Sequence, residues 1–300
     1  MEERIAKLDI QTPAQQLFFT TVRIEASNKD KQGTSTGTAF VFSYPYQDGD
    51  ALFLVTNKHV VADSDTSKFF FTVSDGEKPL IGQRFDIDLH GQGWFGHPEP
   101  NIDITITPLV PIIIEIEKTG KHVFFKTIPH SFIPTSSQLD ELDALEQVTF
   151  VGYPNGIYDT KNLLPIIRKG TTASPLQIDY QGEPTFLIDA SVFPGSSGSP
   201  VFICDTGGYA SKGGFTIGSR VLFLGVIASV LIREEHGQIG FVPIPTTELM
   251  PIFKTHQMID LGVVYKASTV IETIEAFLTR CQEGKTISSF QGIEAGTKIL

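Results

Sequence analysis

Short apolar segments separated by turn-forming residues recur along most of this chain of 300 residues. Clusters of Gly, Pro, Asn and Asp divide these segments at intervals of about ten to fifteen residues, which is typical of all-β sandwiches and barrels. Long helical periodicity is almost absent between them. The sequence therefore predicts an all-β fold, with strands expected over 17–24, 37–43, 51–57, 68–74, 102–108, 148–152, 165–172, 185–191, 200–203, 222–231 and 238–243.

Helix signals are found only near the two ends of the chain. Thr12 can cap a helix that has Pro13 at its first position and Gln15 three residues after the cap, which predicts a short N-terminal helical turn. Thr269 and Glu272 form a second candidate capping box. An apolar stripe follows and predicts a helix over about 269–283 that docks on a core; its members are Val270, Ile271, Ile274, Phe277 and Leu278.

The length of the chain, 300 residues, lies at the upper limit for a single hydrophobic core. Hydrophobic residues make up 41% of the sequence, which is enough for a core of ordinary density. The most polar long interval, 114–147, separates two strand-rich halves and is the expected interdomain connection. The chain is therefore expected to form two β-rich units.

Charge and cysteine content exclude several classes of partner. The chain has 23 Lys and Arg against 34 Asp and Glu, a net charge of −11, and no basic run, so nucleic acid is not an expected partner. The two cysteines, Cys204 and Cys281, have no metal-site spacing, and neither a metal nor another cofactor is expected. A charged N-terminus and the absence of a long uncharged run predict a cytoplasmic protein without membrane contact.

The segment 189–202 contains Gly195-Ser196-Ser197-Gly198, which predicts a tight turn. Glycine on both sides of two serines allows backbone N–H groups to approach a ligand closely. Such a turn can aim two donors at one point beside the Ser197 hydroxyl, which is the arrangement that acyl transfer needs. By itself the same pattern is also that of an ordinary flexible loop.

A serine nucleophile needs a base, and the base needs a group to orient it. Of seven histidines, only His59 ends an apolar, strand-like run, 52–61, although a core histidine that caps a strand would look the same. Asp103 lies between β-branched neighbours, where a partly buried carboxylate requires a partner such as an imidazole N–H. Asp86 and Asp88 are the rival carboxylates, but they lie in an alternating, exposed strand pattern.

Together these segments resemble the trypsin-like (chymotrypsin-fold) serine peptidases, in the motif style of bacterial HtrA/Deg-like and related intracellular members. The resemblance covers about residues 18–253, and its motifs follow the family's order. They are the strand before the histidine at 36–41, an "LTxxHVV" motif at 54–61, a "DIA" motif at 101–104, a "GYP" motif at 148–154, the strand after it at 168–170, and "PGNSGGP" at 194–200.

The resemblance implies two six-stranded antiparallel β-barrels with a short N-terminal helical turn and a C-terminal helix. The implied parts are an N-terminal extension, 1–17, an N-terminal barrel, 18–125, a C-terminal barrel, 126–253, and a C-terminal extension, 254–300. His59 and Asp103 belong to the first barrel, and Ser197 to the second. The residues after 253 are too few for the PDZ domain of HtrA-like enzymes.

The resemblance also implies a serine endopeptidase. His59 is then the general base, Asp103 the group that orients it, and Ser197 the nucleophile, in the chain order of chymotrypsin. The turn Gly195, Ser196, Ser197 forms the oxyanion hole through the N–H groups of Gly195 and Ser197. The expected partners are a protein or peptide substrate and a dedicated regulatory protein. Ser196 stands where secreted trypsins carry an activating aspartate, so their activation route is not expected.

The substrate pocket follows from the same resemblance, with Ser191 at its floor. Because Ser191 is no carboxylate, a substrate side chain that is uncharged and of small to medium size is expected. The strand 225–230 would align the substrate backbone by strand addition, and 239–242 would form another wall. The implied pocket residues are Ser191, Val192, Ala228, Ser229, Val230 and Gly240.

Two alternatives remain to be weighed. An α/β-hydrolase esterase requires G-x-S-x-G and the chain order Ser, acid, His, whereas this chain has Ser199 in place of the last glycine and the opposite order. A catalytically silent trypsin-like domain that binds peptides as an adaptor or sensor stays open, because an ordered oxyanion turn cannot be read from sequence.

Overall fold

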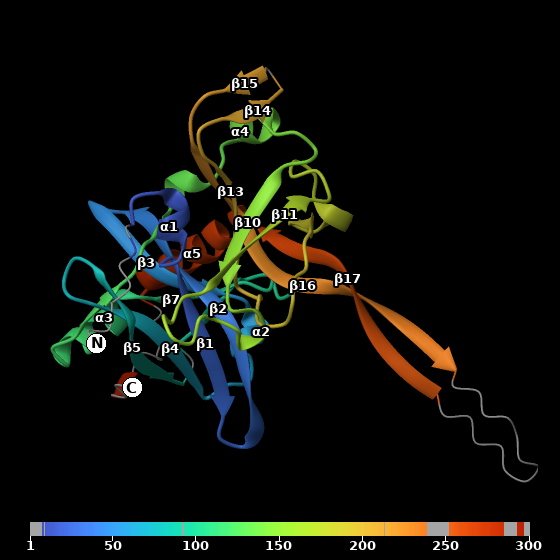
Figure 1. The fold of residues 1–300 in the computed structure, drawn as a ribbon. Coiled ribbons are helices and arrows are strands. Elements are labelled where there is room, and N and C mark those ends of the chain that lie inside the picture. The colour runs from blue at the N-terminus through green and yellow to red at the C-terminus, as the bar shows by residue number, and fades with distance from the viewer. Residues whose placement is uncertain are drawn as a thin grey trace, which may run out of the picture.

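A computed structural model describes residues 8, 10–91, 93–212, 214–238, 252–284 and 293–296. For 31–33, 155, 230–238, 252–259 and 293–296 it describes the backbone only. The chain is mostly β, as the spacing of its apolar runs predicts, and its strands divide into two main systems (Figure 1).

The first system is a ten-stranded sheet in the N-terminal half. Its main path runs β18-β5-β4-β1-β2-β3-β7-β6, with β8 paired to β4 and β9 to β2. The strands are β1 (Thr21–Asn28), β2 (Lys31–Tyr46), β3 (Gly49–Thr56), β4 (Thr66–Ser74), β5 (Pro79–His90), β6 (Phe95–Gly96), β7 (Thr105–Pro108), β8 (His122–Phe124), β9 (Ile128–Pro129) and β18 (Ile293–Gly296).

This sheet differs from the expected N-terminal barrel because its ends do not meet in the part of the chain that the structure describes. At one end, β18 pairs with the outer edge of β5. At the other end lies β6, which has only two residues to offer for pairing. Because β18 occupies one edge and the strand at the other edge is so short, the two edges do not pair with each other and the sheet stays open.

The second system is a closed six-stranded barrel in the order β10-β11-β12-β17-β16-β13, which confirms one of the two expected barrels. The strands are β10 (Gln147–Gly152), β11 (Ile166–Thr172), β12 (Thr185–Asp189), β13 (Pro200–Asp205), β16 (Arg220–Gln238) and β17 (Ile252–Lys266). The strand β17 lies almost wholly beyond residue 253, so the barrel extends past the boundary that the sequence suggests. Figure 1 shows β16 and β17 leaving the barrel as a long two-stranded ribbon. The predicted strand and wall residues at 239–243 lie outside the described residues.

Short helices and one hairpin connect these strands. They are α1 (Pro13–Leu17), α2 (Lys58–Val61), α3 (Val110–Lys118), α4 (Ser136–Glu141), α5 (Ala267–Gln282), the 3-10 helices η1 (His130–Phe132), η2 (Pro154–Gly156) and η3 (Tyr180–Gly182), and the hairpin of β14 (Tyr209–Ser211) and β15 (Gly214–Thr216). Among all the residues that the structure describes, no helix is long and apolar enough to span a membrane.

The two predicted helices are present. The helix α1 has the expected capping box between Thr12 and Gln15. The helix α5 corresponds to the expected C-terminal helix. The capping box predicted at Thr269 is wrong, because the N-cap is Lys266. The Thr269 hydroxyl instead donates to the Lys266 carbonyl at 2.8 Å. The sequence did not predict α3, which occupies part of the expected connection.

A shared hydrophobic core joins the two β systems. Phe40 and Phe42 of β2 lie 5.4 and 5.9 Å, between ring centroids, from Phe223 of β16. Phe277 of α5 lies 5.6 Å from Phe53 of β3, so the C-terminal helix packs on the N-terminal sheet. All of these side chains belong to one buried cluster. The last helix is therefore part of the core and not a separate extension.

Candidate active site

His59 lies directly after β3, on the single turn of α2. The chain enters this turn through Asn57, which is fully buried. The Asn57 side chain donates from Nδ2 to the Asp103 carbonyl at 2.7 Å. The backbone that carries His59 is thus fastened to the segment that carries Asp103.

The imidazole of His59 contacts Asp103 directly. His59 Nδ1 lies 2.5 Å from Asp103 Oδ2, and the His59 backbone N–H donates to Oδ1 at 3.0 Å. Both carboxylate oxygens are therefore engaged by the same residue, which fixes the plane of the ring. Because Nδ1 faces the carboxylate, Nε2 is the atom left to accept a proton. The side chains are 50% exposed for His59 and 25% for Asp103, so the pair opens to solvent.

Two further side chains hold the loop in front of Asp103. Lys58 Nζ donates to the carbonyls of His97 and Glu99, each at 2.9 Å. Burial lowers the pKa of Lys58, and the charge of Asp103 opposes that shift. From the other half of the chain, the Tyr265 hydroxyl donates to the Asn101 carbonyl at 2.8 Å, and burial raises the pKa of Tyr265. Sequence reasoning assigned no role to either side chain. Lys58 lies within the motif at 54–61 but had no predicted contact, and Tyr265 lies outside every quoted motif.

Ser197 lies in a turn that is fixed to both β systems. Its carbonyl accepts from the Thr38 backbone N–H at 3.0 Å, and the next residue, Gly198, donates to the Ile227 carbonyl at 2.8 Å. The Ser197 hydroxyl donates to the Ala228 carbonyl at 3.2 Å. Within the described residues it makes no hydrogen bond to His59. The structure thus places His59 in direct contact with Asp103. Backbone hydrogen bonds hold the Ser197 turn between β2 of the first system and β16 of the second.

Thr38 of β2 links the two parts of the site. Its carbonyl accepts from the Thr56 hydroxyl at 2.7 Å, three residues before His59. Its own hydroxyl donates to the Gly195 carbonyl at 3.2 Å and accepts from the Tyr153 backbone N–H at 3.1 Å. One buried threonine therefore sets the Ser197 turn relative to the end of β3. Its place in the predicted strand 37–43 gave no signal of this role.

The turn before Ser197 has the features of a type II β-turn. The Ser196 N–H donates to the Phe193 carbonyl at 3.0 Å, Pro194 is the second residue, and Gly195 is the third with φ 84°. Among the described residues, the N–H groups of Gly195 and Ser197 have no protein acceptor. These two donors are the ones expected for an oxyanion hole. The Ser196 N–H is already used within the turn, so it cannot contribute a third donor.

Steric contacts explain why position 198 is a glycine. Gly198 has φ 84°, and a Cβ there would lie 1.9 Å from the Thr38 carbonyl oxygen and 2.5 Å from Thr56 Oγ1. A larger residue would push the turn away from β2. The sequence pattern Gly-Ser-Ser-Gly thus serves a close approach of two backbones.

The predicted pocket residues lie on both sides of the Ser197 turn. Ser191 is exposed and Val192 is buried, while on β16 Ala228 is buried and Ser229 exposed. The backbone of Val230 pairs with Gly262 of β17, and Gly240 lies outside the described residues.

Gly262 is a further pocket candidate, which no motif in the sequence indicated. It pairs with Ile188 of β12 as well as with Val230, and a Cβ there would lie 2.7 Å from Val192 Cγ2. The strand β17 therefore supplies a wall beside the segment that precedes Ser197.

Comparison with known families identifies the chain. A sequence profile described as "Trypsin-like peptidase domain" matches residues 37–208. The chain belongs to this family. His59, Asp103 and Ser197 all fall within the matched part of this trypsin-like peptidase. In the described residues of the peptidase, no cluster of three or more His, Cys, Asp and Glu side chains is arranged to hold a metal ion.

Two solved structures are similar to this trypsin-like peptidase over most of their length. The active form of the Rv3671c protease from M. tuberculosis is 17% identical, with a TM-score of 0.45; the match covers 92% of this chain and 93% of that one. The thermostable serine protease AL20 from an extremophilic microorganism is 14% identical, with a TM-score of 0.45; the match covers 89% of this chain and 99% of that one. Comparison with curated protein sequences finds no match.

Proposed function

We propose that this trypsin-like peptidase is a serine endopeptidase whose nucleophile is Ser197. The observation that carries the proposal is the contact of His59 with Asp103 at 2.5 Å, which leaves Nε2 as the proton acceptor. The N–H groups of Gly195 and Ser197, which have no protein acceptor in the described part of the chain, support the second requirement, a place for the developing oxyanion.

The reaction begins when the Ser197 hydroxyl leaves the Ala228 carbonyl and turns toward His59. This rotation exchanges one hydrogen bond for another, and catalytic hydrogen bonds are often loose before substrate binds. His59 Nε2 takes the proton as Ser197 Oγ attacks the carbonyl carbon of the substrate. Asp103 stabilises the imidazolium, while the N–H groups of Gly195 and Ser197 donate to the oxyanion.

The second half of the reaction uses the same groups. His59 gives its proton to the leaving amine, and an acyl-enzyme remains on Ser197. His59 then takes a proton from water, the hydroxide attacks the acyl carbon, and the proton returns to Ser197. The segment 228–230 supports substrate alignment, because β13 pairs with β16 only as far as Val226 and leaves an edge beyond it.

Covalent labelling tests the proposal. A fluorophosphonate should label the folded protein, and Ser197→Ala should abolish the labelling. Ser196→Ala is the matched control, because its side chain is a neighbouring hydroxyl that is buried and has no partner among the described residues. Ser197→Ala should also lower kcat by on the order of 10⁶, as in subtilisin; a loss below about tenfold would place the nucleophile elsewhere.

One observation favours a second candidate, a catalytically silent domain that binds peptides. It is the hydrogen bond from the Ser197 hydroxyl to Ala228 in place of one to His59. Absence of labelling in a folded protein that still binds peptides would support this adaptor function and contradict the endopeptidase.

A further inference from the structure

Arg168 faces the interior of the C-terminal barrel. It lies on β11 directly opposite Phe150 of β10, so the two side chains share one face of the barrel wall. Phe150 is buried and belongs to the barrel core together with Val192. Lys169, the next residue, points to the other face and is exposed. The sequence thus places two adjacent cations on opposite faces of one strand.

One nitrogen of the Arg168 guanidinium lacks a hydrogen-bond partner in the part of the chain that the structure describes. Nη1 is buried and unpaired among the described residues, and the group lies 5.1 Å from the ring centroids of both Phe150 and Phe193. Burial lowers the pKa of Arg168, and Asp260 opposes the shift. An unpaired donor in a buried place is destabilising, so it requires an explanation.

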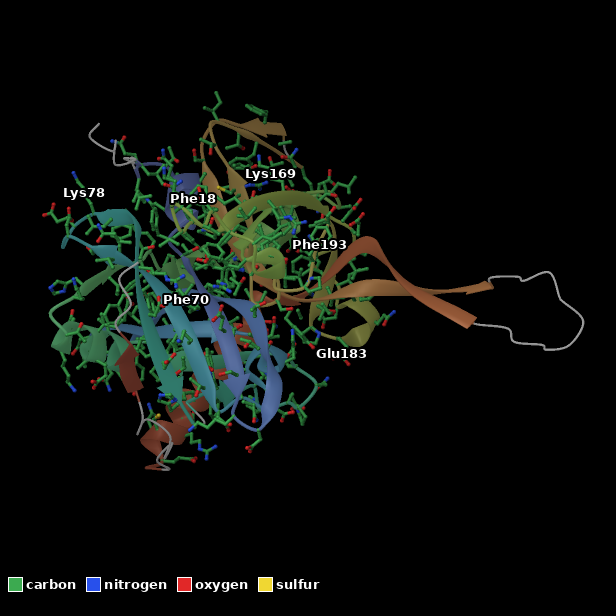
Figure 2. All side chains as sticks on the ribbon, turned by 60° about the horizontal axis from the view of Figure 1, so that its bottom comes forward. Phe18, Phe70, Lys78, Lys169, Glu183 and Phe193 are labelled. Atoms are coloured by element: carbon green, nitrogen blue, oxygen red, sulfur yellow. The ribbon has the colours of Figure 1, made fainter. Side chains whose placement is uncertain are left out.

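Phe193 connects this guanidinium to the candidate active site. It is the first residue of the turn that holds Gly195, and it follows Ser191 and Val192 of the predicted pocket. Figure 2 shows Phe193 on the C-terminal half of the molecule, together with Lys169. A cation stacked against Phe193 therefore lies beside the segment that would contact the substrate side chain next to the scissile bond.

We propose that Arg168 selects substrates that carry glutamate or aspartate on the amino side of the scissile bond, the P1 position. This inference rests on the proposed function and names its substrate class. A carboxylate that enters beside Phe193 would accept from Nη1, which has no hydrogen-bond partner among the residues that the structure describes. Charge on both groups would strengthen this bond. The uncharged preference expected from Ser191 did not take Arg168 into account. Its contact with Phe150 depends on the pairing of β10 with β11, and its contact with Phe193 depends on where the turn before Ser197 lies.

The test compares peptidyl phosphonate probes that differ only at P1. Wild type should react faster with P1-Glu than with P1-Val or P1-Lys. Arg168→Met should lower the ratio of P1-Glu to P1-Val labelling by about 10- to 100-fold, the range expected for a charge-assisted hydrogen bond. Lys169→Met removes the same charge from the exposed face and should leave the ratio unchanged. If Arg168→Met does not fold, Arg168→Gln keeps a polar side chain without the charge and should change the ratio in the same direction.

A binding experiment separates this proposal from the proposed function. Calorimetry on Ser197→Ala with peptides ending in Glu or in Gln should show tighter binding of the Glu peptide, and Arg168→Met should remove the difference. Equal affinity for the two peptides, or a labelling ratio that Arg168→Met leaves unchanged, would overturn the role of Arg168. Failure of every probe to label a folded protein would contradict the endopeptidase, and the calorimetry then decides the role of Arg168 alone.

Discussion

The backbone conformation of single glycines controls the candidate site at the scale of the residue. Gly195 and Gly198 both have φ 84°, a region that costs other residues about 1–2 kcal/mol. At Gly198 the neighbouring Thr38 carbonyl adds a steric limit. At Gly195 the positive φ sets the type II turn, and a type I turn would rotate the peptide between Pro194 and Gly195 away from its present direction.

Gly195→Ala should therefore lower kcat by about 10²- to 10³-fold with little change in KM, because it favours the rotated peptide and removes one oxyanion donor. Steady-state kinetics on a peptide substrate would measure this. Gly207→Ala is the matched control, since Gly207 has φ 86° in a distant loop with open space around its Cβ position. A kcat loss of equal size in Gly207→Ala would show that general strain, and not the donor, is responsible.

At the scale of the element, β2 is the strand on which the two halves of the site meet. Its Thr38 backbone accepts from Thr56 and donates to Ser197, while its side chain bonds Gly195 and Tyr153. The position of the Ser197 turn relative to His59 thus depends on the contacts of this one strand.

Thr38→Val keeps the volume of the side chain but leaves the Gly195 carbonyl and the Tyr153 N–H without their partner. Each buried unpaired group should cost about 1–3 kcal/mol in the free energy of unfolding, and kcat should fall as the turn shifts. Urea unfolding and kinetics would measure the two effects. Thr38→Ser restores the hydroxyl and should recover kcat; failure of this rescue would argue against the hydrogen bonds.

Much of the candidate site could be predicted from the sequence, because its motifs are local. The run before His59, the β-branched setting of Asp103 and the glycines around Ser197 each identify a residue from its neighbours, although the catalytic roles stay predictions. Thr38, Gly262 and Arg168 could not be found in this way. Their roles depend on which strands lie side by side, and no short motif encodes that register.

The same reason explains the errors in the predicted fold. Apolar runs predict strands, but they do not predict how a sheet ends. The edges of the N-terminal sheet are the short strand β6 and the strand β18, whose pairing with β5 joins residues about 200 positions apart. The strand β17 was missed because the last strand predicted from the apolar runs, at 238–243, lies before it.

At the scale of the whole molecule, the shared core predicts that the two β systems unfold as one cooperative unit. Phe223 of the barrel packs on Phe40 and Phe42 of the sheet. Trp94, the single tryptophan, lies in the N-terminal half, where its Nε1 donates to Ser67 at 3.1 Å. Its fluorescence therefore reports on the half that does not contain Phe223.

Phe223→Ala should destabilise the protein by about 3–5 kcal/mol, because a large fully buried ring leaves a cavity. The unfolding transitions followed by Trp94 fluorescence and by far-ultraviolet circular dichroism should shift together. A Trp94 transition that stays at its wild-type midpoint would show that the halves unfold independently.

The packing of α5 on the N-terminal sheet has a consequence for biosynthesis. Phe53 and Phe95 of the sheet are covered by Phe277, which the ribosome adds only after it has made both halves. The apolar side chains of the N-terminal half that Phe277 covers therefore stay exposed until translation has passed the end of α5. A nascent chain would thus complete this part of its core only after Phe277 has emerged from the ribosome.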